Sequence, residues 1–114
     1  MTSLYDVTVS VRIPNGSAGA GVARAVTQAM AARAGLPPLS SARAGGVVAG
    51  GLRGSTGAVR LELAAATGSL QVWLSADDAA VERMADQLAD HGVERNGERL
   101  VLRFERAPLH GVPD

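Results

Sequence analysis

The stretch VRLELAAATGSLQVWLS, residues 59–75, decides the fold of this 114-residue chain. Apolar and polar residues alternate on both sides of a Thr67-Gly68-Ser69 turn. The apolar positions are Val59, Leu61 and Leu63 before the turn, and Leu70, Val72 and Leu74 after it. A period of two is typical of a strand with one buried face, and a short turn containing Gly joins two such strands. The stretch therefore predicts a β-hairpin.

Two further segments alternate in the same way. The first runs from Tyr5 to Ile13 and ends at Pro14, which cannot donate to a strand ladder. The second contains Leu100, Leu102 and Phe104 and follows an Asn96-Gly97 turn signal. We expect a strand in each, with a short extra strand at Val93 as an option.

Helical patterns fill the intervals between these strands. Residues 18–33 are rich in Ala, and Val22, Val26 and Met30 recur every four residues, which predicts a helix with that stripe buried. Asn15 or Ser17 can cap its start, and Gly35 lies just beyond its end. A second helix is expected from Leu39-Ser40-Ser41 to Leu52. Its four glycines (Gly45, Gly46, Gly50 and Gly51) indicate either very close packing against a neighbour or partly irregular structure.

A third helix is predicted after Asp77 and Asp78, which suit the capping position and first turn of a helix. Val81, Met84 and Leu88 form its apolar stripe. The resulting order is β-α-α-β-β-α-β. It predicts an α+β fold with a mixed or antiparallel sheet of about 4–5 strands, covered on one face by 2–3 helices. We expect one domain over residues 1–107 and a frayed tail over 108–114.

Composition limits the partners. Eleven Arg balance eleven acidic residues without a basic run, which favours neither nucleic acid nor an anionic membrane. The chain has no Cys, so disulfides and thiolate sites are excluded. No signal-peptide pattern or long apolar stretch is present, and the expected location is the cytoplasm.

Four features of the sequence could be sites of chemistry, and each has a stronger structural interpretation. The glycines of residues 16–21 lie where a phosphate loop would, but Arg24 replaces the third glycine of a dinucleotide motif. His91 fits a helix end, Ser55 fits a turn, and the pair Asp77-Asp78 fits a cap better than a cation site. We therefore predict no catalytic residue, no metal and no cofactor.

The whole pattern resembles the GHKL-type (histidine-kinase-like) ATPase fold in its anti-sigma-factor serine-kinase branch. The resemblance covers residues 4–106 and depends on element order: VTVSVRIP at 7–14, the Ala/Arg helix up to Gly35-Leu36, the segment from Leu39, the hairpin at 59–74, and the last helix and strand. No individual family motif is matched.

The resemblance implies where a nucleotide site would lie and indicates that it is lost. Family members carry a Glu and, four residues later, an Asn on the second helix, and the matching positions here lie near Val48 and Leu52. The Asp-x-Gly that reads adenine would fall on Ala76-Asp77-Asp78, with Ala76 in place of Asp and Asp78 in place of Gly. The Gly-rich lid is missing. Apolar side chains cannot bind magnesium, so catalysis is not expected.

The expected function is a non-catalytic regulatory module of bacterial transcription that binds a protein of the sigma-factor or anti-sigma-antagonist type. Self-association as a homodimer is compatible with its Ala- and Gly-rich helices. Two alternatives stay open at this point. One is a divergent ATP-binding serine kinase with a phosphate loop in residues 45–57, and the other is an unrelated small α+β homodimer of unknown ligand.

Overall fold

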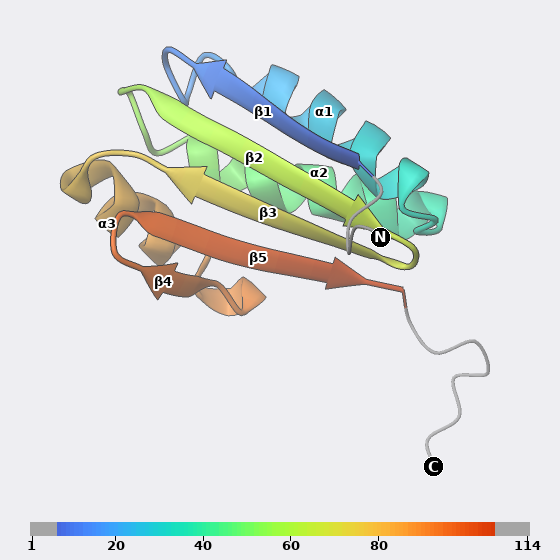
Figure 1. Cartoon of the computed structure of the whole chain (residues 1–114). Coiled ribbons are helices and arrows are strands. Elements are labelled where there is room, and N and C mark those ends of the chain that lie inside the picture. Colours follow the sequence, from blue (N-terminus) through green and yellow to red (C-terminus); the bar gives the residue numbers. More distant parts are fainter. Residues whose placement is uncertain (1–6, 107–114) are drawn as a thin grey trace.

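A five-stranded antiparallel sheet with three α-helices forms the architecture of the computed structural model, which describes residues 7–106 (Figure 1). The α+β class and the order β-α-α-β-β-α-β are confirmed, with one short strand added before the last. The elements are β1 (Val7–Ile13), α1 (Ala20–Arg33), α2 (Pro38–Leu52), β2 (Val59–Ala66), β3 (Ser69–Ser75), α3 (Asp78–Gln87), the 3₁₀ turn η1 (Ala89–His91), β4 (Glu94–Asn96) and β5 (Arg99–Glu105). Tyr5 and the predicted tail over 108–114 lie outside the described residues.

The strands follow the order β1-β2-β3-β5-β4, and every neighbouring pair is antiparallel. The hairpin of β2 and β3 closes at Ala66 and Ser69, and Gly68 takes φ +83° in the turn between them. β5 then pairs with β3, which leaves the short β4 at the outer edge. Within residues 7–106, β1 and β4 are therefore the edge strands, and β5 is also an edge beyond Val101, where its pairing with β4 ends.

The helices lie on one face of the sheet (Figure 1). The core between the two layers consists of aliphatic side chains, and its largest fully buried members include Leu52, Leu61, Leu63, Leu70, Leu74, Met84, Leu88, Leu100 and Leu102. Burial of such side chains is the main favourable contribution to folding. No helix among the described residues covers the opposite face of the sheet (Figure 1).

Helix α1 differs from the prediction in its start and in its buried face. It begins at Ala20 behind Gly19, and the Asn15 side chain accepts from Ala18 N–H in the preceding turn instead of capping the helix. Its buried side chains are Ala20, Ala23, Thr27, Met30 and Ala31, whereas Val22 is 57% exposed. Of the predicted stripe, Met30 is buried and Val26 packs partly buried against the core, but Val22 is wrong, because the small side chains of Ala20 and Ala23 face the core instead and allow closer packing than Val would.

The end of α1 agrees with the prediction. Gly35 has φ +90°, and its N–H donates to Ala32 O while Leu36 N–H donates to Ala31 O. This pair of bonds is the Schellman arrangement, in which a glycine beyond the last turn satisfies two helix carbonyls.

Helix α2 is continuous from Pro38 to Leu52, one residue earlier than predicted, so its four glycines do not interrupt it. A Cβ at Gly45 would lie 2.6 Å from Gln28 Cγ, and a Cβ at Gly51 would lie 2.9 Å from Leu88 Cδ1. Gly45 and Gly51 therefore allow α1 and α3 to approach α2 closely.

Helix α3 begins as predicted, because Asp77 Oδ1 accepts the N–H of Ala80 over 2.8 Å. Its predicted stripe of Val81, Met84 and Leu88 is fully buried. The extra strand expected at Val93 forms over Glu94–Asn96 instead. Among residues 7–106, none of the helices combines the length and apolar character needed to span a membrane.

Candidate functional site

The Gly-rich turn before α1 contacts the turn after α2. Gly16 N–H donates to Gly57 O over 3.0 Å, and Ser17 N–H donates to Ser55 O over 2.6 Å. A Cβ at Gly16 would lie 3.0 Å from the carbonyl oxygens of Leu52 and Ser55. These amides, which a phosphate loop would direct at its ligand, here hold two turns of the chain together.

The other polar residues considered from the sequence are dispersed. Ser55 is fully buried, and its hydroxyl has no hydrogen-bond partner within residues 7–106. Asp77 caps α3, and Asp78 lies 3.8 Å from Arg95 with its side chain 79% exposed. The sequence predicts His91 at the end of the third helix. In the structure α3 ends earlier, and His91 is exposed in η1. The described part of the chain contains no cluster of three or more His, Cys, Asp or Glu side chains that could hold a metal.

The positions that the resemblance assigns to nucleotide binding lie on α2 and at the start of α3. Val48 and Leu52 are completely buried in the core, and Ala76 is half-buried between β3 and α3. Leu88 packs on Gly51, and Arg83 Nε donates to Gly54 O over 3.2 Å.

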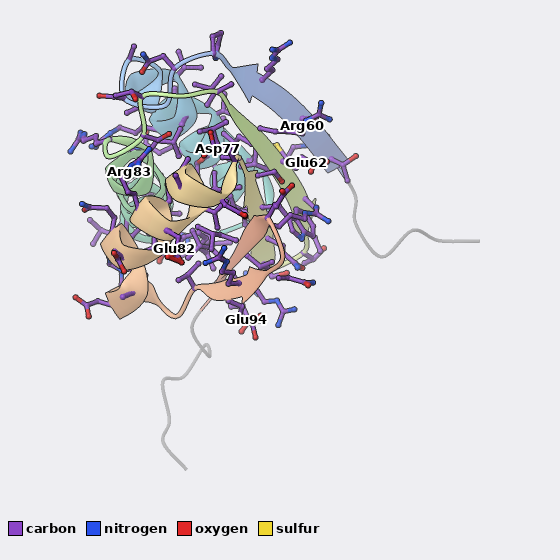
Figure 2. All side chains as sticks on the ribbon, turned by 90° about the vertical axis from the view of Figure 1, so that its left-hand side faces the viewer. Arg60, Glu62, Asp77, Glu82, Arg83 and Glu94 are labelled. Carbon is purple, nitrogen blue, oxygen red and sulfur yellow. The ribbon has the colours of Figure 1, made fainter. Side chains whose placement is uncertain are left out.

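Figure 2 views the molecule from this end, with Asp77 at the start of α3 and Arg83 beside the end of α2. Apolar side chains and a main-chain carbonyl thus fill the contact. The side chains of Val48 and Leu52 offer no oxygen ligand to a cation, and the amide side chain at this contact belongs to Gln87, whose Nε2 would lie 3.9 Å from a Cβ at Gly54.

The uncovered face of the sheet carries the most distinctive surface residue, Trp73. Its neighbours across the strands are Glu62 on β2 and Val101 on β5, followed by Ser10 on β1 and Glu94 on β4. Arg60, Glu62 and Glu94 extend from this face in Figure 2. Outward positions on antiparallel strands are ordinarily polar, so a half-buried Trp in the middle of this face is an exception.

Arg99 connects Trp73 to its charged surroundings. Its Cζ lies 5.6 Å from the centroid of the indole, within the range of a cation–π interaction, and its Nη2 lies 3.3 Å from Glu62 Oε1. Both charged side chains are partly exposed. The arrangement orients Arg99 beside the ring.

Trp73 separates two shallow hollows on this face. One is lined by Thr8, Ser10, Ala64 and Glu62 on the β1 side of the ring, and the other by Gln71, Val101, Arg103, Glu94 and Asn96 on the β4 side. Ala64 forms a low floor because its side chain is small and only 1% exposed. The surface around Trp73, Glu62, Arg99 and these two hollows is called the Trp73 face below.

Reasoning from the sequence did not single out this face as a site. The available signal is the position of Trp73 on β3, because it alternates with Val72 and Leu74 and therefore points away from the core. No protein-family model matches the chain, and no curated protein matches it.

Proposed function

We propose that this protein is a non-catalytic regulatory module that binds a partner protein through the Trp73 face. The observation that carries the proposal is the Trp73 ring itself, which lies between two hollows on an uncovered sheet face with Arg99 beside it. Trp and Arg are among the residues most enriched in the hot spots that dominate the binding energy of protein interfaces. Hot-spot side chains lie in well-packed pockets and tend to pair with hot spots on the partner. A protein surface can bury the indole while projecting side chains into both hollows.

The packing of α2 against α3 supports a non-catalytic role. Leu88 on Gly51 and the buried side chains of Val48 and Leu52 occupy the region that the resemblance assigns to magnesium and nucleotide. We further propose, on the resemblance, that the partner is a sigma factor or an anti-sigma antagonist of a bacterial host. That resemblance depends on the element order.

Trp73→Thr tests the proposal, because threonine favours a strand and removes the indole. Leu39→Ser is the matched control, since Leu39 is 86% exposed and lies on α2, in the other layer. Tagged wild type and both variants would be used to recover partners from the host, with quantitative mass spectrometry. We expect the wild type and Leu39→Ser to retain a sigma-pathway protein. Trp73→Thr should lose at least about thirtyfold in affinity, the effect of removing an interface anchor worth about 2 kcal/mol.

The purified pair would then be titrated directly. Trp73 is the only Trp in the chain, so its fluorescence should change on binding if the partner covers it. Recovery of no sigma-pathway protein, or equal recovery with Trp73→Thr, would contradict the proposal. Light scattering adds a further check, because a dimer that Trp73→Thr dissociates would assign the face to a second copy of the chain.

A further inference from the structure

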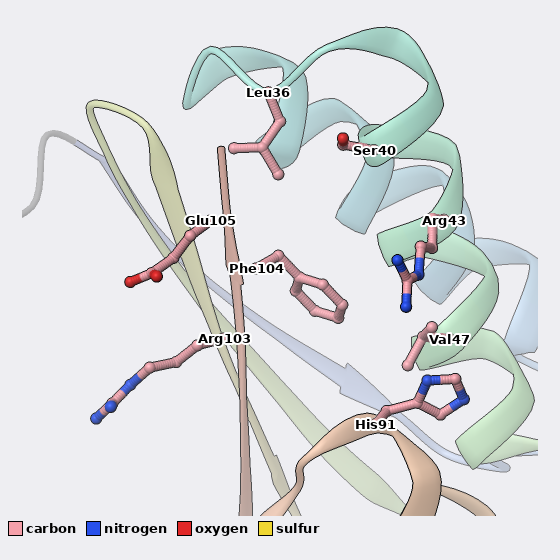
Figure 3. A pocket seen from close by; sticks show the side chains of 8 residues that line it. All are labelled: Leu36, Ser40, Arg43, Val47, His91, Arg103, Phe104 and Glu105. Atoms are coloured by element: carbon pink, nitrogen blue, oxygen red, sulfur yellow. The ribbon is translucent and has the colours of Figure 1, made fainter. Parts of the chain in front are cut away.

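A second feature lies on the other side of the sheet, where the helical layer does not fully cover β5. A cavity of about 220 Å³ opens between α2, η1 and β5, lined by Leu36, Ser40, Arg43, Val47, His91, Arg103, Phe104 and Glu105 (Figure 3). The Phe104 ring lies between the strand and α2, and Arg43 and His91 approach from the helical side. Phe104 is only half-buried, whereas Leu100 and Leu102 earlier on β5 are fully buried. We call this cavity the Phe104 pocket.

The side chains of Arg103 and Glu105 point away from the Phe104 pocket (Figure 3). Arg103 and Glu105 therefore line the Phe104 pocket with their main-chain atoms. The short β4 pairs only with Arg99–Val101, so the outer edge of β5 continues beyond it. Within residues 7–106 no strand pairs with this continuation.

The direction of the main-chain groups on that edge follows from two hydrogen bonds to the β3 side. Glu98 O accepts from Ala76 N–H, and Arg106 N–H donates to Gly68 O. Successive residues of a strand direct their N–H and C=O groups to opposite sides, so the even-numbered residues of β5 bond towards β3. Arg103 and Glu105 consequently present N–H and C=O groups outward, directly beside the Phe104 pocket. Such an edge accepts a further strand.

The residues that line the Phe104 pocket indicate which kind of ligand side chain would fit it. Its base is apolar, from Leu36, Val47 and Phe104, and Arg43 supplies a permanent positive charge at its wall. No acidic side chain within residues 7–106 forms a salt bridge with Arg43. The Ser40 hydroxyl and the His91 ring add hydrogen-bonding groups. A carboxylate on a short aliphatic stem complements this combination.

We infer that the outer edge of β5 at residues 103–105 binds an extended segment of a partner protein, which adds as a sixth strand and places a Glu side chain in the Phe104 pocket. Strand addition of this kind gains affinity from main-chain hydrogen bonds and specificity from pockets for alternate side chains. The residue opposite Phe104 on an added strand has its side chain on the same face of the sheet as Phe104. The Glu is therefore the residue paired with Phe104.

This inference adds a second contact mode to a protein-binding module, and it does not depend on the Trp73 face. The two surfaces lie on opposite faces of the sheet and share only Arg103, which contributes its side chain to the Trp73 face and its main chain to the Phe104 pocket. Failure of one proposal thus leaves the other testable.

The probe is the blocked peptide acetyl-Ser-Val-Thr-Glu-Thr-Val-Ser-amide, titrated into the full chain and followed by the amide shifts of ¹H–¹⁵N spectra. We expect saturable shifts at Arg103, Glu105, Arg43 and His91. A peptide with Gln in place of Glu should bind at least tenfold more weakly. The same Glu peptide, N-methylated at the alternate residues whose N–H groups would donate to β5, should not bind.

Protein variants complete the test. Arg43→Gln should weaken peptide binding at least tenfold, whereas Arg53→Gln, an exposed Arg at the other end of α2, and Trp73→Thr should bind like the wild type. The inference is overturned by any of three results: no saturable shift up to 2 mM peptide, shifts centred on the β1 edge, or equal affinity for the Glu and Gln peptides. Unchanged binding by a folded Arg43→Gln variant would also overturn it.

Discussion

Thr27 is the clearest single residue at which stability can be improved. It lies on the buried face of α1 at 0% exposure, and its Oγ1 has no hydrogen-bond partner among residues 7–106. A buried hydroxyl without a partner costs about 1–3 kcal/mol, and Val keeps the branched shape without that hydroxyl. We expect Thr27→Val to raise the free energy of unfolding by about 1 kcal/mol in urea titrations. Thr27→Ser is the control and should be less stable than the wild type. A loss on Thr27→Val would show that the hydroxyl has a partner after all.

Individual residues differ in how well the sequence predicted their environment. Asp77 was predicted as a cap because a carboxylate before an apolar stripe has a local role, and it caps α3. Val22 was predicted to be buried and is 57% exposed. A helix as rich in Ala as α1 has little difference between its faces, so its orientation is decided by the neighbours it packs on. Trp73 could be assigned to an outward position from alternation, but its two hollows arise from side chains on other strands.

At the level of elements, α2 allows a paired experiment on its glycines. A Cβ at Gly45 would meet Gln28 Cγ at 2.6 Å and the Arg24 carbonyl oxygen at 2.9 Å, so Gly45→Ala must push α1 away from α2. We expect it to lower the free energy of unfolding by about 1–3 kcal/mol, as overpacking typically does. A Cβ at Gly46 or Gly50 would meet nothing within 4 Å. Gly46→Ala and Gly50→Ala should each raise the free energy of unfolding by about 0.5–1 kcal/mol, because Ala favours a helix interior.

Circular dichroism during thermal and urea unfolding would measure all three glycine variants. If Gly45→Ala were as stable as Gly46→Ala, the close contact of α1 with α2 would be incorrect. The sequence left open whether these glycines mark close packing or irregular structure. Gly45 and Gly51 are sites of close packing. The sequence of α2 alone does not distinguish Gly45 from Gly46, because the difference lies in the neighbouring helices that contact only one of them.

For the whole molecule, element order was predictable and strand neighbours were not. Alternation and turn residues are local, and they gave the strands, the hairpin at Thr67-Gly68 and the α+β class. The sheet order β1-β2-β3-β5-β4 depends instead on β5 returning beside β3 after α3. That return places the short β4 outermost and exposes the rest of the β5 edge beside Phe104. Both proposed surfaces therefore follow from long-range pairing, which no local pattern encodes.

The whole-molecule packing also predicts the response to nucleotide. Leu88 fills the contact between α2 and α3, and releasing a buried Leu from a core costs about 2–5 kcal/mol. A nucleotide between these helices would have to offset that cost without a carboxylate at Val48 or an amide at Leu52 to hold magnesium. We expect calorimetric titration with ATP or ADP, with and without magnesium, to give no saturable heat up to about 1 mM ligand, which corresponds to less than about 4 kcal/mol of binding free energy. A dissociation constant of about 100 μM or tighter, near 5–6 kcal/mol, would favour the divergent serine kinase. Repeating that titration with Leu88→Ala would then locate the site, because binding that strengthens when Leu88 is shortened would place the nucleotide between α2 and α3.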